Sequence, residues 1–231
     1  MRFRVRKLPV GPLQANCYLV WGGADSGESA GGAAADGSAP VPGTPCLVID
    51  PGAEPERILA ALGEERLRPE LIVATHCHGD HIGAVDELLA AFPEAAWAVG
   101  AAEAEWPVRP ALNLSYGFGM PLEVRPPTRL LRDGDDLAVG PLTFKVLAVP
   151  GHSPGSVALY CAAGSSVFTG DALFAGDIGR ADLPGGDEAE LVASVRSKIL
   201  TLPDDTVVWP GHANRSRVGF EKRNNPYVGE S

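Results

Sequence analysis

The sequence lacks the features that mark membrane, secreted and disulfide-bonded proteins. No stretch approaches about 18 consecutive apolar residues, and the N-terminus holds no apolar segment of the signal-peptide kind. The cysteines are few and scattered, with no Cys-x-x-Cys pair: Cys17, Cys46, Cys77 and Cys161. Such spacing is typical of reduced thiols rather than of a disulfide framework or a structural zinc site. We therefore expect a cytoplasmic protein that does not enter the membrane.

Positive charge is also scarce. The chain carries 19 Lys and Arg against 29 Asp and Glu, which gives a formal net charge of −10 and a pI of about 4.9. An acidic protein repels the phosphate backbone of nucleic acids. The one basic stretch, Arg2–Lys7, alternates in the manner of an edge strand with a solvated face. The sequence therefore predicts a partner other than nucleic acid.

Large apolar side chains are almost absent from residues 22–45, which are rich in Gly, Ala, Ser, Asp and Pro. A segment of this composition cannot bury enough surface to order itself, so we expect a long flexible insertion there. The chain as a whole has 231 residues, of which 45% are hydrophobic. This length and composition predict a single domain over residues 1–231 that interrupts its core only at the insertion.

Outside the insertion, strand-like runs alternate with helical patterns. Strands are expected at residues 2–8, 17–21, 46–49, 71–75, 142–149, 157–161, 167–169 and 206–209. Helices are expected at 55–62, 83–92 and 187–200, and the last opens with Asp187 as N-cap and Glu190 three residues on. Residues 106–128 are rich in Pro, Gly and aromatics and predict an ordered excursion, whereas a short polar tail is expected to end the chain. The mixture indicates a two-sheet core flanked by helices.

Histidine is rare here, yet each of the five histidines stands where a metal site would need it. Three lie in the segment Thr75-His76-Cys77-His78-Gly79-Asp80-His81, and the others are His152 and His212, each directly after a Pro-Gly pair. Asp171 ends an apolar strand in the same way, after Thr169-Gly170. Imidazole is the commonest metal ligand in proteins, and turns fixed by Gly and Pro give such ligands rigid support. The sequence therefore predicts a metal centre at strand ends.

The number of these side chains indicates two ions. In an extended loop, residues two apart point the same way, so His76 and His78 can bind one ion together. After a turn at Gly79, Asp80 and His81 can face a second ion. A catalytic ion takes three or four protein ligands and keeps a position open for water. We assign His76, His78 and His152 to a first ion. We assign Asp80, His81 and His212 to a second ion, and Asp171 bridges the two. We expect two divalent ions, zinc first, with iron or manganese also compatible with these ligands.

In their order along the chain, these motifs resemble those of the metallo-β-lactamase superfamily. The matching segments span most of the chain: Thr75–His81, Pro150–Gly155, Thr169–Asp171 and Pro210–His212. The resemblance implies an α/β fold of the metallo-β-lactamase type, which is a four-layer αββα sandwich with a dinuclear site at the sheet edges. The ligand assignment given above matches the pattern of that family.

Within the superfamily the chain looks most like the small single-domain hydrolases of the glyoxalase II (hydroxyacylglutathione hydrolase) group. The matching segments are Gly11–Tyr18, Gly170–Phe174 and Ile178–Asp187. Full glyoxalase II carries a C-terminal helical domain that helps bind glutathione, whereas 19 residues follow His212 here. The resemblance therefore implies the chemistry of that group and leaves open whether glutathione is part of the substrate.

The ligands and the resemblance together predict a metal-dependent hydrolase that cleaves a thioester or related acyl bond of a small molecule. Two cations about 3.5–4 Å apart lower the pKa of a bridging water, and the resulting metal-bound hydroxide attacks the polarised carbonyl. Asp80 and Asp171 are the predicted catalytic residues, because they hold the ions that carry this nucleophile. Asp50 is expected either to orient a ligand histidine or to cap a turn. Cys77, which alternates away from the ligands, is expected to be a packed thiol.

Several alternatives stay open. Persulfide dioxygenases also resemble this chain and use one iron bound by the equivalents of His76, His152 and Asp171. A lactonase or β-lactamase would use the same ligands on another substrate, because pocket residues select the substrate. A non-catalytic metal-binding protein would explain the fold without turnover. The motifs do not specify the oligomeric state. Two further groups have either a site role or an ordinary structural one: Tyr116, Phe118 and Met120 as pocket walls, and Arg180 with Asp182 as a brace.

Overall fold

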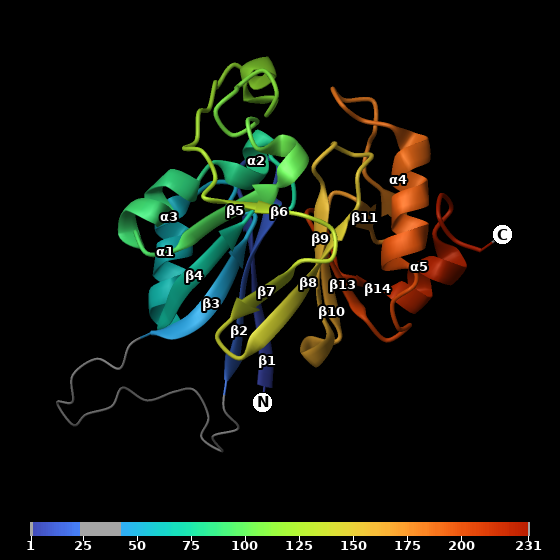
Figure 1. Ribbon diagram of the computed structural model, residues 1–231, viewed down its shortest axis with the longest axis horizontal. Coiled ribbons are helices and arrows are strands. Elements are labelled where there is room, and N and C mark those ends of the chain that lie inside the picture. The colour runs from blue at the N-terminus through green and yellow to red at the C-terminus, as the bar shows by residue number, and fades with distance from the viewer. Residues whose placement is uncertain (1, 24–42, 231) are drawn as a thin grey trace.

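The chain forms two six-stranded sheets that face each other, with helices on the outer face of each (Figure 1). This computed structural model describes residues 2–23 and 43–230. The predicted four-layer αββα sandwich is confirmed. Most of the expected insertion lies outside the described residues, but its ends belong to strands, because Gly22 and Gly23 lie in β2 and Thr44 begins β3. In the part of the chain that the structure describes, no helix is long and apolar enough to cross a membrane.

The first sheet has the order β1-β2-β3-β4-β5-β6. Its strands are β1 (Arg2–Val10), β2 (Ala15–Gly23), β3 (Thr44–Ile49), β4 (Leu67–Val73), β5 (Ala96–Gly100) and β6 (Arg129–Leu131). The first three pair antiparallel, and β3 to β6 run parallel. Helices α1 (Pro55–Glu64) and α3 (Val85–Ala91) cover the outer face (Figure 1). Because parallel strands end at one edge of a sheet, the loops after β3, β4 and β5 meet there.

The second sheet has the order β14-β13-β10-β9-β8-β7. Its strands are β7 (Asp136–Val139), β8 (Leu142–Ala148), β9 (Val157–Cys161), β10 (Ser166–Gly170), β13 (Val207–Pro210) and β14 (Ser216–Arg217). A small hairpin of β11 (Leu173–Phe174) and β12 (Asp177–Ile178) follows β10. Its helices are α4 (Glu188–Ser194), which continues as the π-helical η4 (Val195–Ile199), and α5 (Val218–Asn224). The carboxylate of Asp187 accepts the Glu190 N–H at 3.0 Å, which confirms the predicted N-cap.

Three apolar clusters fill the three interfaces between the four layers. Tyr18, Ile49, Phe144 and Phe168 belong to the cluster between the two sheets. A second cluster, which includes Ile58, Leu62 and Leu88, joins the first sheet to α1 and α3, and a third, which includes Val167, Leu191 and Val208, joins the second sheet to α4. Both faces of each sheet are therefore buried, which explains why the inner strands read as continuous apolar runs.

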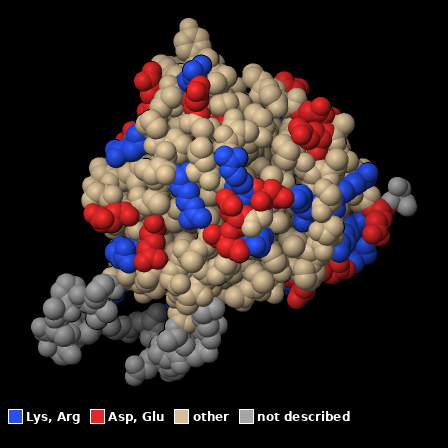
Figure 2. Space-filling view, viewed as in Figure 1, with Lys and Arg blue, Asp and Glu red and all other residues tan. Residues whose placement is uncertain are grey.

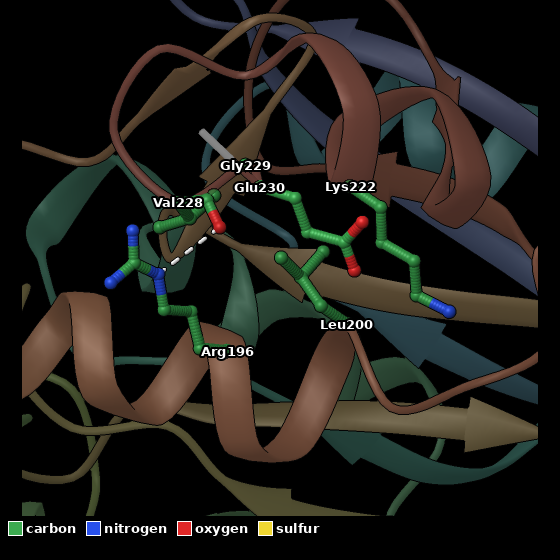
Figure 3. Close-up of a pocket in the computed structure, with 6 residues that line it drawn as sticks. All are labelled: Arg196, Leu200, Lys222, Val228, Gly229 and Glu230. Carbon is green, nitrogen blue, oxygen red and sulfur yellow. Dashed lines mark hydrogen bonds between the residues drawn. The ribbon is translucent and has the colours of Figure 1, made fainter.

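The prediction of a polar C-terminal tail is wrong. Residues after His212 form β14 and α5, and Val218 and Val228 are buried in the third cluster. The Arg196 guanidinium of η4 donates to the Val228 carbonyl at 3.1 Å, and both residues line a surface pocket together with Gly229 and Glu230 (Figure 3). The buried apolar positions in this segment are too few and too widely spaced to produce a readable period, so the packing is visible only in the fold.

Residues 106–128 are ordered, as predicted. Asn113 is buried at the centre of this excursion, where its side-chain amide donates to the Leu122 carbonyl at 2.9 Å. The backbone carbonyl of Asn113 accepts the Gly79 N–H at 2.8 Å. Because Gly79 begins α2 (Gly79–Ile82), this contact seats the excursion directly on the histidine segment.

Candidate metal centre

The seven predicted ligand side chains lie together. Two of them, Asp80 and His81, belong to α2, which lies at one end of the sandwich (Figure 1). Three of their groupings have ligand atoms within 4.8 Å of one another: His76, His78 and His152; His76, His81 and Asp171; Asp80, His81 and His212. His76 follows β4, Asp171 follows β10 and His212 follows β13. The carboxyl ends of strands from both sheets thus bring together residues that are more than 100 positions apart in the sequence.

Asp80 and His81 reach the centre from a helical turn rather than from the expected extended loop. Both lie in α2, and Gly79 starts this helix without a positive φ. Gly79 is instead constrained by space, since a Cβ there would lie 3.3 Å from the Cβ of Ser115. Consecutive side chains on a helix diverge, which aims Asp80 and His81 at the centre from different directions.

Two histidines have their outer ring nitrogen fixed by a backbone carbonyl. Nδ1 of His152 lies 2.7 Å from the Arg180 carbonyl, and Nδ1 of His212 lies 3.1 Å from the Leu13 carbonyl. A carbonyl oxygen only accepts, so Nδ1 must carry the proton in each ring. In the neutral ring, Nε2 then carries no proton and keeps its lone pair, which is the form that binds a metal.

The Asp50 carboxylate lies against the outer nitrogens of two more rings, directly at His81 and through Thr75 at His76. Its Oδ2 lies 3.1 Å from Nδ1 of His81 and also accepts the Thr75 hydroxyl at 2.8 Å. That hydroxyl oxygen lies 3.3 Å from Nδ1 of His76, so it receives this proton while donating its own to Asp50. Oδ1 of Asp50 accepts the Thr75 N–H at 2.7 Å, and the carboxylate is fully buried. Of the two roles expected for Asp50, the geometry supports the orientation of ligand histidines.

Several inner atoms of the cluster have no hydrogen-bond partner among the residues that the structure describes. His76 Nε2, His78 Nε2, His81 Nε2 and Asp171 Oδ1 are buried and make no hydrogen bond. Nδ1 of His78, in contrast, lies at hydrogen-bond distance from His152 Nε2, 3.1 Å away. Buried polar atoms without a partner are costly, and a cation would satisfy several at once. Imidazole and carboxylate suit zinc, iron and manganese. The residues therefore fit a divalent metal site.

The charge state of the cluster is set by burial and by its carboxylates. Burial, with His152 and His81 nearby, lowers the pKa of His78 to about 3, and burial likewise holds the pKa of His76 well below its usual value. Burial alone lowers the pKa of His81, but the nearby carboxylates, Asp80 first, outweigh it and raise that pKa to about 10. Without a metal, the proton on His81 balances these carboxylates, and a cation would displace it.

The remaining predicted residues lie around the centre. Cys77 is a buried thiol and is not among the grouped ligand residues, as expected. The carboxylate of Asp182 receives two 2.7 Å hydrogen bonds from Arg180 on the surface, so this pair is a surface pair, while the Arg180 carbonyl positions His152. Tyr116 and Met120 are 71% and 68% exposed, so they do not pack in the core.

Sequence reasoning missed Glu103, a fully buried residue of η1 (Ala101–Glu103). Its carboxylate accepts the Cys77 N–H at 2.6 Å and the Gly155 N–H at 2.8 Å. The surrounding segment, Ala101-Ala102-Glu103-Ala104-Glu105, contains no motif that marks one glutamate over the other. Only the fold distinguishes Glu103 from the exposed Glu105.

Comparison with known proteins identifies a family, relatives and solved structures to which the chain is similar. Residues 41–212 match the family described as the metallo-beta-lactamase superfamily. The probable metallo-hydrolase YqgX of Bacillus subtilis is 35% identical and the hydroxyacylglutathione hydrolase GloC of Haemophilus influenzae is 34% identical, each over 96% of both chains. Among solved structures, BLEG-1 B3 metallo-beta-lactamase has a TM-score of 0.85 at 36% identity, covering 97% of this chain and 99% of that one. TTHA1623 in a di-iron-bound form has a TM-score of 0.76 at 36% identity, covering 96% and 100%.

Proposed function

Because the chain belongs to the metallo-β-lactamase superfamily, we propose that it is a metal-dependent hydrolase that cleaves a thioester or related acyl bond of a small molecule. The observation that carries this proposal is the buried cluster of ring nitrogens and one carboxylate oxygen, Asp171 Oδ1, that have no hydrogen-bond partner in the described part of the chain. The relative named metallo-hydrolase supports the reaction type, and the relative named hydroxyacylglutathione hydrolase supports the acyl bond.

The ligands divide into a buried group and a more open one. His76, His78 and His152 would hold the first ion, and all three are nearly inaccessible. Asp80, His81 and His212 would hold the second, and the side chains of Asp80 and His212 are 26% and 25% exposed. We therefore infer that substrate reaches the centre from the second position.

Asp171 would bridge the two ions. Its Oδ1 lies 3.6 Å from His81 Nε2, and its Oδ2 lies 3.9 Å from His152 Nε2 and 3.6 Å from His212 Nε2. This carboxylate thus faces histidines of both groups. When bound, the two ions, zinc or the iron found in TTHA1623, would polarise the substrate carbonyl and lower the pKa of a bound water.

Side chains of the protein give the open side of the centre a negative charge and an apolar surface. Burial raises the pKa of Asp80, but His81 and His212 outweigh it and hold this pKa well below its usual range, so Asp80 stays ionised. Leu13 is exposed beside His212, and the Phe174 ring lies 6.4 Å from the His212 ring. Apolar surface next to the open ligands suits an acyl group.

One face of the molecule and the net charge favour a small-molecule substrate over a nucleic acid. On the face drawn in Figure 2, Lys and Arg side chains are interspersed with Asp and Glu, without the basic stripe that a phosphate backbone needs. The formal net charge of −10 acts in the same direction.

The proposed function is tested by counting metal and measuring turnover on the same preparation. We expect about two zinc ions per chain when the protein is purified and reloaded with zinc, and hydrolysis of S-lactoylglutathione or simpler acyl thioesters. A chelator should abolish hydrolysis, and added zinc should restore it. One iron per chain with oxygen uptake on glutathione persulfide would instead establish a dioxygenase. Turnover only of lactones or β-lactams would change the substrate class, and metal binding without any turnover would indicate a non-catalytic protein.

An Asp50→Asn substitution is expected to weaken zinc binding about 10- to 100-fold, the usual effect of losing a group that orients a ligand histidine. The amide keeps the volume of Asp50 but carries no negative charge. Its NH2 group also replaces one of the two oxygens, which face the Thr75 N–H, the Thr75 hydroxyl and His81 Nδ1. Competition titration with a chelator measures the loss. The exposed carboxylate of Asp133, which pairs with Lys198, supplies the control Asp133→Asn, for which no change is expected. Equal affinities for the two variants would contradict the role given to Asp50.

A further inference from the structure

The carboxylate of Glu103 bonds to both segments that carry the histidines of the first position. Its Oε2 accepts the N–H of Cys77, which lies between His76 and His78, at 2.6 Å. Its Oε1 accepts the N–H of Gly155, three residues after His152, at 2.8 Å. Hydrogen bonds from N–H groups to a buried ionised carboxylate are short and strong. One side chain therefore ties together two segments that lie more than 70 residues apart in the sequence.

The packing around Glu103 leaves these segments little freedom. A Cβ on Gly155 would lie 2.7 Å from Cγ of Glu103, and a Cβ on Gly100 would lie 1.9 Å from the Gly155 carbonyl oxygen. Both positions therefore need glycine so that η1 and the turn at residues 153–155 can approach closely. The Cys77 thiol also faces the Glu103 carbonyl at 3.9 Å. The buried carboxylate thus lies in a tightly packed junction rather than in a loose loop.

This junction sets the spacing of three imidazole rings. The ring centroids of His76, His78 and His152 lie 4.6 to 4.8 Å from one another, each pair edge to face. The two segments must keep their relative position for the three rings to share one ion, because a metal site tolerates displacements of only about 0.5 Å. The second position has other supports, since Asp50 lies at His81 and the Leu13 carbonyl at His212.

We propose that Glu103 is a positioning residue for the first metal position alone, fixing His76 and His78 relative to His152. This inference rests on the proposed two-ion centre. Glu103 belongs to none of the three ligand groupings and acts only through the backbone of Cys77 and Gly155. Loss of the Glu103 carboxylate should therefore weaken the binding of one ion and leave the binding of the other unchanged. A general loss of stability would not produce this difference.

The test is a zinc titration of metal-free Glu103→Gln against a competing chelator. Glutamine keeps the size of the side chain, but its NH2 group must face one of the two N–H donors, so one hydrogen bond is lost. We expect the affinity of one zinc to fall about 10- to 100-fold while that of the other is unchanged. The matched control is Glu221→Gln, because Glu221 is also fully buried and accepts a backbone N–H, from Gly176 at 3.0 Å. This control should lose stability and keep both zinc affinities.

Two further measurements keep the inference open to refutation if Glu103→Gln does not fold. Glu103→Asp keeps the charge but withdraws it by one methylene, and it should show the same selective loss to a smaller degree. In the wild-type metal-free protein, hydrogen exchange should find the Cys77 and Gly155 amides protected. Unprotected amides, an unchanged titration, or equal weakening of both ions would overturn the role of Glu103. A wild-type chain that binds one zinc, with the loss still seen in Glu103→Gln, would refute the two-ion centre and support Glu103.

Discussion

An Asp171→Ala variant is expected to hydrolyse its substrate at least about 10³-fold more slowly than the wild type. Asp171 is the carboxylate that faces His81, His152 and His212, so its removal weakens both proposed ion positions. Metal ions supply several kcal/mol of transition-state stabilisation, and each 1.36 kcal/mol is worth a factor of ten in rate. Losing about 4 kcal/mol of this stabilisation costs about three orders of magnitude in rate.

The measurement combines turnover with the number of ions bound per chain. We expect Asp171→Ala to bind fewer than two ions while circular dichroism remains that of the wild type, because the side chain lies at the end of a sheet and not in its core. Asp204 supplies the control, since its exposed carboxylate pairs with Lys222 and Arg223 away from the cluster. Asp204→Asn should keep full activity. An Asp171→Ala protein with two ions and full turnover would show that Asp171 is not the bridge.

The clustering of the seven proposed ligand side chains could be predicted from the sequence because local signals mark them. His152, Asp171 and His212 each follow a strand-like run and a glycine. All five histidines of the chain belong to these motifs or to the segment Thr75–His81. Strand ends of an α/β sandwich converge at one edge, so such residues meet even when more than 100 positions separate them. A two-sheet core flanked by helices was predictable for a related reason, since buried strands produce apolar runs that the helices interrupt. Its αββα form was implied by the family resemblance of the motifs.

The supports of the centre could not be predicted, because they depend on contacts between distant segments. The four-residue helix that carries Asp80 and His81 is too short to show a period. Glu103 differs from Glu105 only in what surrounds it after folding, and α5 is held by two buried valines in a polar segment. A proposed ligand is marked in the sequence by its residue type and spacing. A supporting residue is marked only by the contacts that it makes after folding.

A Gly52→Ala substitution is expected to reduce the free energy of unfolding by about 3 kcal/mol, the cost of strong overpacking. Gly52 follows Asp50 in the turn after β3, and a Cβ there would lie 1.6 Å from the carbonyl oxygen of Asp80. A Cβ on Gly83, just after α2, would in turn lie 2.3 Å from the Gly52 carbonyl oxygen. Two backbones thus meet without room for a methyl group. Alanine would push α2 away from the turn and separate His81 from Asp50.

Gly63→Ala is the matched control, because Gly63 lies in helix α1 and a Cβ there would meet nothing within 4 Å. Alanine should leave stability unchanged or raise it by up to about 1 kcal/mol, since it reduces the freedom of the unfolded chain. Urea unfolding of the two metal-free variants measures both effects. Zinc titration should also show weaker binding for Gly52→Ala alone, because Asp80 and His81 move with α2. If the two alanine variants were equally stable, the close packing of α2 against the turn after β3 would be wrong, and Asp50 could not be the residue that fixes His81.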